Sequence, residues 1–177
     1  MKRIRFYIFI ISLPFVFLNS NYAQTIDESD TTIVIAAGLG FENTSTAQVP
    51  IDSLIALGKT YLGLPYRTTV RAPWPLDCSG YVSMLYGHYG VKLPHSSGGI
   101  ADITQKISLK EAQPGDLLFF KGRDSRKNRV GHVALIIEVH EDYVLMMHST
   151  NSKGIIIEQY PDGYYYTKRF IKAGRLQ

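Results

Sequence analysis

Residues 77–90 read DCSGYVSMLYGHYG, and this stretch decides the helical part of the fold. Its larger side chains recur every three or four positions, at Cys78, Val82, Leu85 and Tyr89. That spacing predicts one buried face of an α-helix, which Asp77 can cap and Gly90 can end. Cys78 would then lie in the first helical turn, where the helix dipole favours a thiolate and lowers the thiol pKa.

Helical spacing also precedes this stretch, and strand patterns follow it. Residues 51–62 have the period of an amphipathic helix ended by Gly63, and residues 94–107 indicate a loop with a short helix opened by Ser96 or Ser97. Apolar runs then predict strands over residues 117–120, 133–139, 143–148, 154–160 and 164–173. Strands that come after helices, without alternating with them, indicate an α+β fold with an antiparallel sheet.

Composition excludes several classes of protein. The chain has 177 residues, of which 45% are hydrophobic and 19% charged, as expected for one globular domain. Lys2, Arg3 and Arg5 contribute much of the net charge of +4, so the remainder is nearly neutral and does not indicate a nucleic-acid partner. A single cysteine rules out an internal disulfide and any zinc site with several cysteine ligands.

The N-terminus has the order of a signal peptide. Residues 1–5 are basic, residues 6–18 are largely apolar, and a short polar stretch follows with Ala23 at the expected cleavage site. The apolar run is shorter than the roughly 20 residues that span a bilayer, although a retained membrane anchor is the alternative. We therefore expect a signal peptide over 1–23, a linker or N-terminal extension over 24–50, and a single domain over 51–177.

A signal peptide over residues 1–23 predicts export to the periplasm or the extracellular space, with no stable membrane insertion after the peptide is cleaved. Structural cysteines in an oxidising compartment usually pair, and Cys78 has no partner in its own chain. A chemical role for this thiol is therefore favoured over the alternative of a buried structural cysteine.

Two histidines flank a predicted hairpin. His132 precedes the strand over 133–139, and His148 ends the strand over 143–148. A two-residue loop would place them on opposite faces of the sheet, because side chains alternate along a strand. A three-residue loop over 140–142, or a bulge with the same effect on phase, would place them on one face, and we predict one of these two arrangements.

Cys78 and His132 would then form a nucleophile and base pair, with His148 orienting His132. This arrangement suits acyl transfer, in which a thiolate attacks a carbonyl and the histidine protonates the leaving amine. An alternative is a zinc enzyme, since one cysteine and two histidines could supply three ligands.

Several motifs carry a family resemblance. The runs are YLGLPYR at 61–67, DCSGYV at 77–82, GVKLP at 90–94, QPGDLLFF at 113–120, GHVA at 131–134 and HST at 148–150. In this order they resemble the NlpC-type cysteine peptidases that cut bacterial cell-wall peptides. The resemblance covers residues 51–173.

The resemblance implies a papain-like α+β fold, with N-terminal helices packed on a central antiparallel sheet, and a catalytic triad of Cys78, His132 and His148. It also implies that Tyr66, Asp77 and Ser79 bind the acyl side of the substrate. The partner would be a peptidoglycan stem peptide, cut at the γ-D-glutamyl-diamino acid bond by a monomer that needs no metal or other cofactor. Alternatives are an amidase or acyltransferase with the same thiolate chemistry, and an inactive wall-binding module.

Overall fold

A computed structural model describes residues 49–68 and 76–177 of the chain. The predicted signal peptide (1–23) and nearly all of the predicted extension (24–50) lie outside the described residues. Within residues 49–68 and 76–177, no helix is both long and apolar enough to cross a membrane.

In the described residues, three α-helices precede all six strands. They are α1 (Ile51–Lys59), α2 (Cys78–His88) and α3 (Ser97–Asp102). Asp77 caps α2 and Ser96 caps α3, as the sequence predicts. The first helix ends at Lys59, earlier than predicted, and a turn carries the chain to Gly63, whose φ is +82°.

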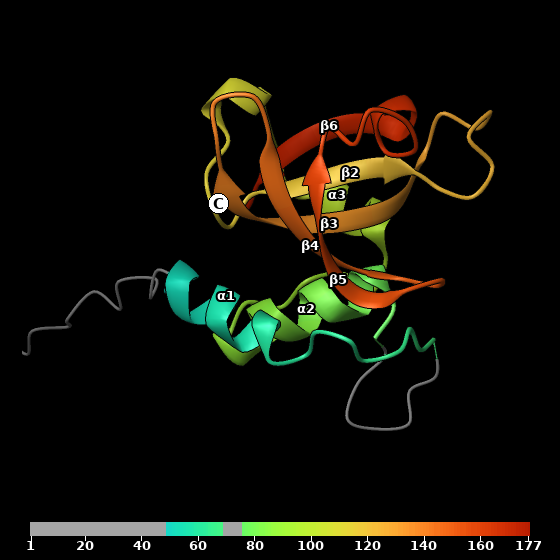
Figure 1. The fold of residues 1–177 in the computed structure, drawn as a ribbon. Coiled ribbons are helices and arrows are strands. Elements are labelled where there is room, and N and C mark those ends of the chain that lie inside the picture. The colour runs from blue at the N-terminus through green and yellow to red at the C-terminus, as the bar shows by residue number, and fades with distance from the viewer. Residues whose placement is uncertain (1–48, 69–75) are drawn as a thin grey trace, which may run out of the picture. The chain divides into compact units, whose positions relative to one another are not determined.

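The strands form one six-stranded antiparallel sheet in the order β1-β6-β2-β3-β4-β5 (Figure 1). Their bounds are β1 (Gln105–Ile107), β2 (Leu117–Lys121), β3 (Val130–Val139), β4 (Val144–Thr150), β5 (Gly154–Tyr160) and β6 (Phe170–Arg175). Two 3₁₀ turns, η1 (Leu109–Glu111) and η2 (Thr167–Arg169), precede β2 and β6. The predicted α+β fold is confirmed.

Two predictions about strands β1 and β6 are wrong. Residues 105–107 form β1, which pairs with β6, although the sequence indicated only a loop and a short helix there. The last strand begins at Phe170 because η2 occupies the start of the predicted strand over 164–173. The three residues of β1 are too few for a period of two to be detected, and the three-residue turn η2 interrupts the apolar run before β6.

Each face of the sheet has its own hydrophobic core. One face packs against α1 and α2, and Figure 1 shows these helices together on one side of the sheet. The other face is covered by three aromatic side chains: Tyr160 at the end of β5, Tyr166 in the connection that follows, and Phe170 at the start of β6. Residues 117–120 of β2 are therefore buried on both sides, which explains their continuous apolar run.

A β-bulge sets the phase between β3 and β4. Next to the turn, Val139 pairs with Val144 and the His140 N–H donates to the Tyr143 carbonyl at 2.8 Å, so the loop has two residues and the predicted three-residue loop is wrong. The register shifts between Ile136 and Glu138, after which Leu135 pairs with Met147. The bulge therefore has the predicted effect on phase.

The segment before α2 is attached to β5 by its backbone. The Gly63 N–H donates to the Ile155 carbonyl and the Ile155 N–H donates to the Leu64 carbonyl, both at 2.9 Å. A second attachment joins β4 to the residue before the helix cap, because the Ser149 hydroxyl donates to the Leu76 carbonyl. These bonds hold residues 63–64 against β5 and Leu76, just before α2, against β4.

Gly154 allows this close approach. Its φ is +71°, and a Cβ there would overlap the carbonyl oxygen of Leu64, whereas Gly163 has φ +74° with open space around it. We expect Gly163→Ala to lower the free energy of unfolding by about 1 kcal/mol through backbone strain alone, and Gly154→Ala to lower it by about 3 kcal/mol. Urea denaturation of both variants measures the difference, and equal losses would contradict the role given to the Leu64 contact.

Candidate active site

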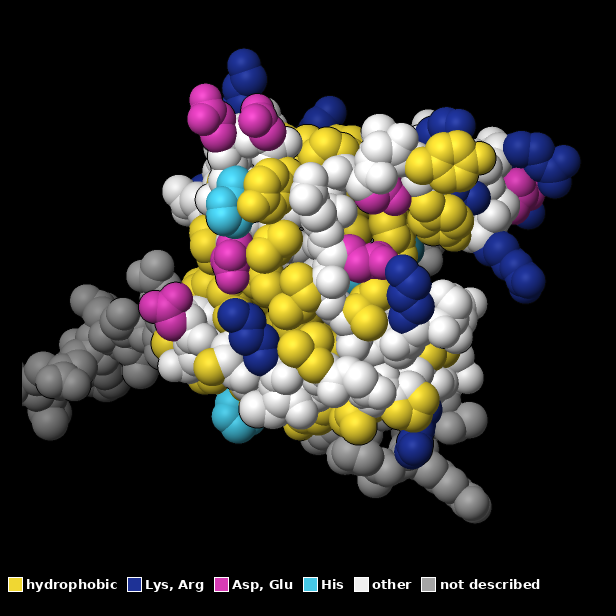
Figure 2. Space-filling view, in the orientation of Figure 1, with side chains coloured by type: hydrophobic (Ala, Val, Ile, Leu, Met, Phe, Trp, Pro, Cys, Tyr) yellow, Lys and Arg dark blue, Asp and Glu magenta, His cyan; other side chains and the backbone are white. Residues whose placement is uncertain are grey.

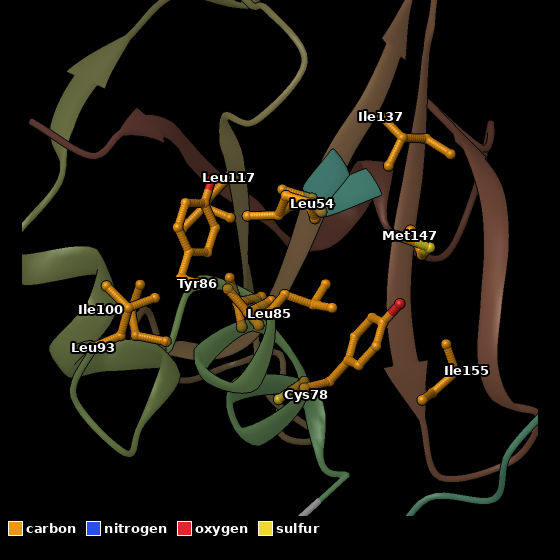
Figure 3. Packing of buried hydrophobic residues seen from close by; sticks show 14 of the residues in the cluster. Leu54, Cys78, Leu85, Tyr86, Leu93, Ile100, Leu117, Ile137, Met147 and Ile155 are labelled. Atoms are coloured by element: carbon orange, nitrogen blue, oxygen red, sulfur yellow. The ribbon is translucent and has the colours of Figure 1, made fainter. Parts of the chain in front are cut away.

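Cys78 is the first residue of α2 and lies at the edge of the larger core cluster (Figure 3). The Asp77 carboxylate accepts from the Gly80 N–H at 2.7 Å and from the Ser79 hydroxyl at 3.1 Å, both through Oδ1. The cap therefore fixes the first turn of the helix and with it the position of the thiol. Only 9% of the Cys78 surface is exposed.

The expected lowering of the thiol pKa is wrong. Burial raises the pKa of Cys78 above its ordinary value, and the nearby Asp77 carboxylate raises it further. The backbone N–H of Val133 in β3 lowers it, as do those of Ser79 and Cys78 at the start of α2, but together they do not outweigh burial. The thiol is therefore protonated in the resting protein.

His132 and His148 meet on one face of the sheet. His132 Nε2 lies 2.8 Å from His148 Nδ1, a hydrogen bond between neighbouring strands. Burial lowers the pKa of His132 to about 3, and the neighbouring His148 adds to this effect. His132 is consequently a neutral imidazole at physiological pH.

Glu158 extends this pair. Its Oε2 lies 3.1 Å from His148 Nε2, and its Oε1 lies 2.6 Å from Lys153 Nζ. The bond with His148 lowers the pKa of Glu158 to about 2, and Lys153 acts in the same direction, so the carboxyl group is ionised. His148 itself is fully buried, and both of its ring nitrogens are hydrogen-bonded, Nδ1 to His132 and Nε2 to Glu158.

Tyr166 covers both histidines. Its ring stacks on His132 with centroids 5.6 Å apart and meets His148 edge to face at 5.2 Å. The Asp162 carboxylate holds this segment by accepting from the backbone N–H groups of Tyr166 and Thr167 at 2.8 and 3.0 Å. The tyrosine thus excludes water from one side of the pair.

One hollow of about 500 Å³ brings several of these groups together. Cys78, His132 and Tyr66 all line it, as do Lys121 at the end of β2 and Arg123 of the β2–β3 loop. Figure 2 shows Lys and Arg side chains gathering at the end of the molecule where this loop lies. Asp77 and Ser79 are not among the lining residues.

Sequence reasoning missed Glu158 and Tyr166. Glu158 lies between Ile157 and Gln159 on β5, and a glutamate beside a glutamine is typical of a solvent-facing part of a strand. Tyr166 lies in a run of three tyrosines, of which Tyr164 is largely exposed. Glu158 lies two residues after Ile156, which pairs with His148, and therefore on the same face of the sheet as His148. This signal can be used only once the strand register is known.

His132 Nε2 and His148 Nδ1 bind each other, so these two nitrogens are not free to bind a metal ion. Among the described residues, no group of three or more His, Cys, Asp or Glu side chains could hold a metal ion. This geometry does not favour the alternative in which Cys78, His132 and His148 are zinc ligands.

Comparison with known families agrees with the fold and the order of the motifs. The sequence model of the NlpC/P60 family matches residues 63–175. The chain belongs to the NlpC/P60 family. Its papain-like α+β class follows from this membership and from the architecture described above.

Two curated relatives illustrate the range of the family. The chain is 37% identical over 86 residues to a gamma-D-glutamyl-L-lysine dipeptidyl-peptidase of Bacillus cereus, covering 49% of this chain and 26% of the relative. It is 30% identical over 131 residues to a gamma-DL-glutamyl hydrolase of Bacillus subtilis, covering 73% of this chain and 31% of the relative. The chain therefore spans about a quarter to a third of the length of these relatives.

Solved structures share the same architecture. An NlpC/P60 family protein of Bacillus cereus superposes with a TM-score of 0.59 at 31% identity, covering 71% of this chain and 39% of that one. RipD of Mycobacterium tuberculosis, described as a non-catalytic NlpC/p60 domain protein, superposes with a TM-score of 0.53 at 22% identity, covering 72% of this chain and 97% of that one. The second likeness concerns the fold alone.

The low pKa of His132 makes stability depend on pH. Below its ordinary pKa of 6.5 the unfolded chain binds a proton that the folded chain does not bind until about pH 3, so acid favours unfolding. Between about pH 7.5 and about pH 5.5, we expect the wild type to lose about 1 kcal/mol more free energy of unfolding than His132→Gln. Urea titrations at both pH values measure this, and parallel losses in the two proteins would show that His132 is not held neutral.

Proposed function

We propose that this protein is a cysteine peptidase that hydrolyses peptidoglycan stem peptides, at the bond between γ-D-glutamate and a diamino acid. The observation that carries the proposal is the placement of Cys78 and His132 in one hollow, with His132 held by His148. The family relatives named as peptidases support the reaction class. The proposed catalytic residues are Cys78, His132 and His148.

In the proposed reaction, the Cys78 thiol gives its proton to His132 and the sulfur attacks the carbonyl carbon of the γ-glutamyl group. The imidazolium of His132 then protonates the leaving amine of the diamino acid as the C–N bond breaks. A thioester remains on Cys78. Water attacks it with His132 as base, and the acid product leaves while the thiol recovers its proton.

The first turn of α2 supports the charged intermediate in this scheme. A helix leaves its first N–H groups without intrahelical acceptors, and the Asp77 carboxylate takes the one from Gly80. The N–H groups of Cys78 and Ser79 thus remain for the oxyanion, with the positive end of the helix dipole behind them.

We also propose that Tyr66, Asp77 and Ser79 bind the acyl side of the substrate. Tyr66 lines the hollow beside Cys78. The Asp77 cap uses Oδ1 for both of its described hydrogen bonds, and its other oxygen would pair with the free amine of an N-terminal L-alanine. Ser79 would act through Asp77, to which its hydroxyl donates.

The site would act outside the cytoplasm if residues 1–23 are a signal peptide, as we propose. Under this scheme residues 51–177 form the peptidase domain, and the family match over 63–175 lies within it.

Replacing the nucleophile tests the reaction. We expect Cys78→Ala to lower the rate of L-Ala-γ-D-Glu release from L-Ala-γ-D-Glu-diaminopimelate by at least about 1,000-fold, because no other group can form the thioester. Mass spectrometry of the products measures release, with intact murein as a second substrate. Murein binding without cleavage by the wild type would support the wall-binding alternative, and cleavage of another acyl donor alone would support the amidase or acyltransferase alternative.

Removing the charge of Asp77 tests the acyl-side contact. Asn is as good an N-cap as Asp, so Asp77→Asn should keep the helix while losing its pairing with the substrate amine. We expect KM for the free tripeptide to rise about 10-fold with kcat nearly unchanged, and the N-acetylated tripeptide to be a poor substrate for the wild type. Equal hydrolysis of the free and acetylated peptides by the wild type would contradict this contact.

A further inference from the structure

We infer that Glu158 is a positioning residue that fixes the proton arrangement of both histidines and so leaves a base nitrogen on His132. The inference rests on the proposed function, in which His132 accepts the Cys78 proton. Glu158 Oε2 lies 3.1 Å from His148 Nε2, and His148 Nδ1 lies 2.8 Å from His132 Nε2, so the three side chains form one connected row.

Register places Glu158 for this contact. In the β4–β5 pairing, His148 lies opposite Ile156 and Met146 lies opposite Glu158, so all four side chains share one face of the sheet. The glutamate is one diagonal step from the histidine. Lys153 lies in the turn between β4 and β5, and its Nζ is 2.6 Å from the other carboxylate oxygen, Oε1.

The proton arrangement follows from what each atom can donate. An ionised carboxylate only accepts hydrogen bonds, so His148 must carry its proton on Nε2. A neutral His148 then has a lone pair on Nδ1, and His132 must donate to it from Nε2. His132 is left with its lone pair on Nδ1, and that nitrogen becomes the base. Glu158 therefore determines, through two rings, which nitrogen can take a proton.

A neutral amide at position 158 would remove this control. The NH₂ group of glutamine can donate to His148 Nε2, which moves the His148 proton to Nδ1 and turns the His132 Nε2 into the acceptor. His132 Nδ1 then carries a proton and cannot act as a base. In Ser-His-Asp enzymes the comparable change from Asp to Asn leaves the geometry intact and produces the wrong tautomer.

The charge of Glu158 acts in the same direction. When His132 takes the Cys78 proton it becomes an imidazolium, and a carboxylate beyond His148 stabilises that cation. The titratable and charged groups around the pair are Cys78 of α2, Lys153 and Asp162 of the turns that flank β5, and Tyr160 and Tyr166. Lys121 and Arg123 also line the hollow beside His132. Glu158 is negatively charged and in direct contact with a histidine of the pair.

The chain offers a closely matched control. Glu138 of β3 also contacts a lysine and a histidine, with Oε1 at 3.9 Å from Lys59 Nζ and Oε2 at 3.5 Å from His140 Nε2. It lies on the exposed end of β3, and its His140 is not one of the proposed catalytic residues. Glu138→Gln thus makes the same chemical change in a similar ion pair without touching the site.

We expect Glu158→Gln to lower kcat on the tripeptide by at least about 100-fold with KM changed less than about 3-fold, and Glu138→Gln to leave both within about 2-fold. The rate of Cys78 alkylation by iodoacetamide, followed against pH, should also shift to higher pH in Glu158→Gln only. A merely structural role would not move this profile in a variant that unfolds at the same urea concentration. Wild-type kcat and alkylation in Glu158→Gln would overturn the inference.

A measurement on the wild type needs neither a variant nor turnover. Long-range ¹H–¹⁵N NMR spectra at about pH 8 report the tautomer of each histidine, and we expect the Nε2–H form for both His132 and His148. An Nδ1–H form of His132 would overturn the inference even if the peptidase is active. If the tripeptide is not cleaved while both histidines have the expected form, the proposed substrate fails and the role of Glu158 stands.

Discussion

The site depends on one extra residue in β3. Because the register with β4 shifts between Ile136 and Glu138, His132 and His148 come to lie on the same face and within hydrogen-bond distance. Without that shift, the two-residue turn at the hairpin tip would direct the imidazoles to opposite sides of the sheet. The cover by Tyr166 requires both rings on this face, and the contact between Glu158 and His148 reaches His132 only through their hydrogen bond.

Burial gives this pair its electrostatic character. The thiol of Cys78 and the ring of His132 both favour their neutral forms, since burial raises the pKa of the first and lowers the pKa of the second. The helix N-terminus favours the thiolate but is outweighed. A charge separation between sulfur and imidazole therefore requires support from its surroundings. The buried His148 and the half-buried Glu158 beyond it lie where such support can be given.

The sequence allowed the fold class and the placement of Cys78 to be predicted because both rest on local signals. The cap at Asp77 and the period of the helix are properties of adjacent residues. The phase of the histidines could be limited to two arrangements by counting, and the bulge was one of them. The direction of the thiol pKa was not predictable, because it depends on how much of the fold covers the sulfur.

The role of Glu158 and the existence of β1 could not be predicted, because both depend on how distant strands pair. The role of Glu158 becomes visible only when β4 and β5 are aligned, and β1 exists only because β6 pairs with it. Both depend on partners far away in the sequence. Local propensity contains little information about such pairings.

The position of β6 has a consequence for how the protein is made. This strand lies between β1 and β2, so the sheet has a vacant interior place until residues 170–175 have left the ribosome. Pairings between Gln105 and Arg175 and between Leu117 and Gly174 span long stretches of chain and form late. Tyr166, which shields the histidines, reaches its place only with this last closure. Completion of the sheet and of the site thus waits for residues far along the chain to join strands made much earlier.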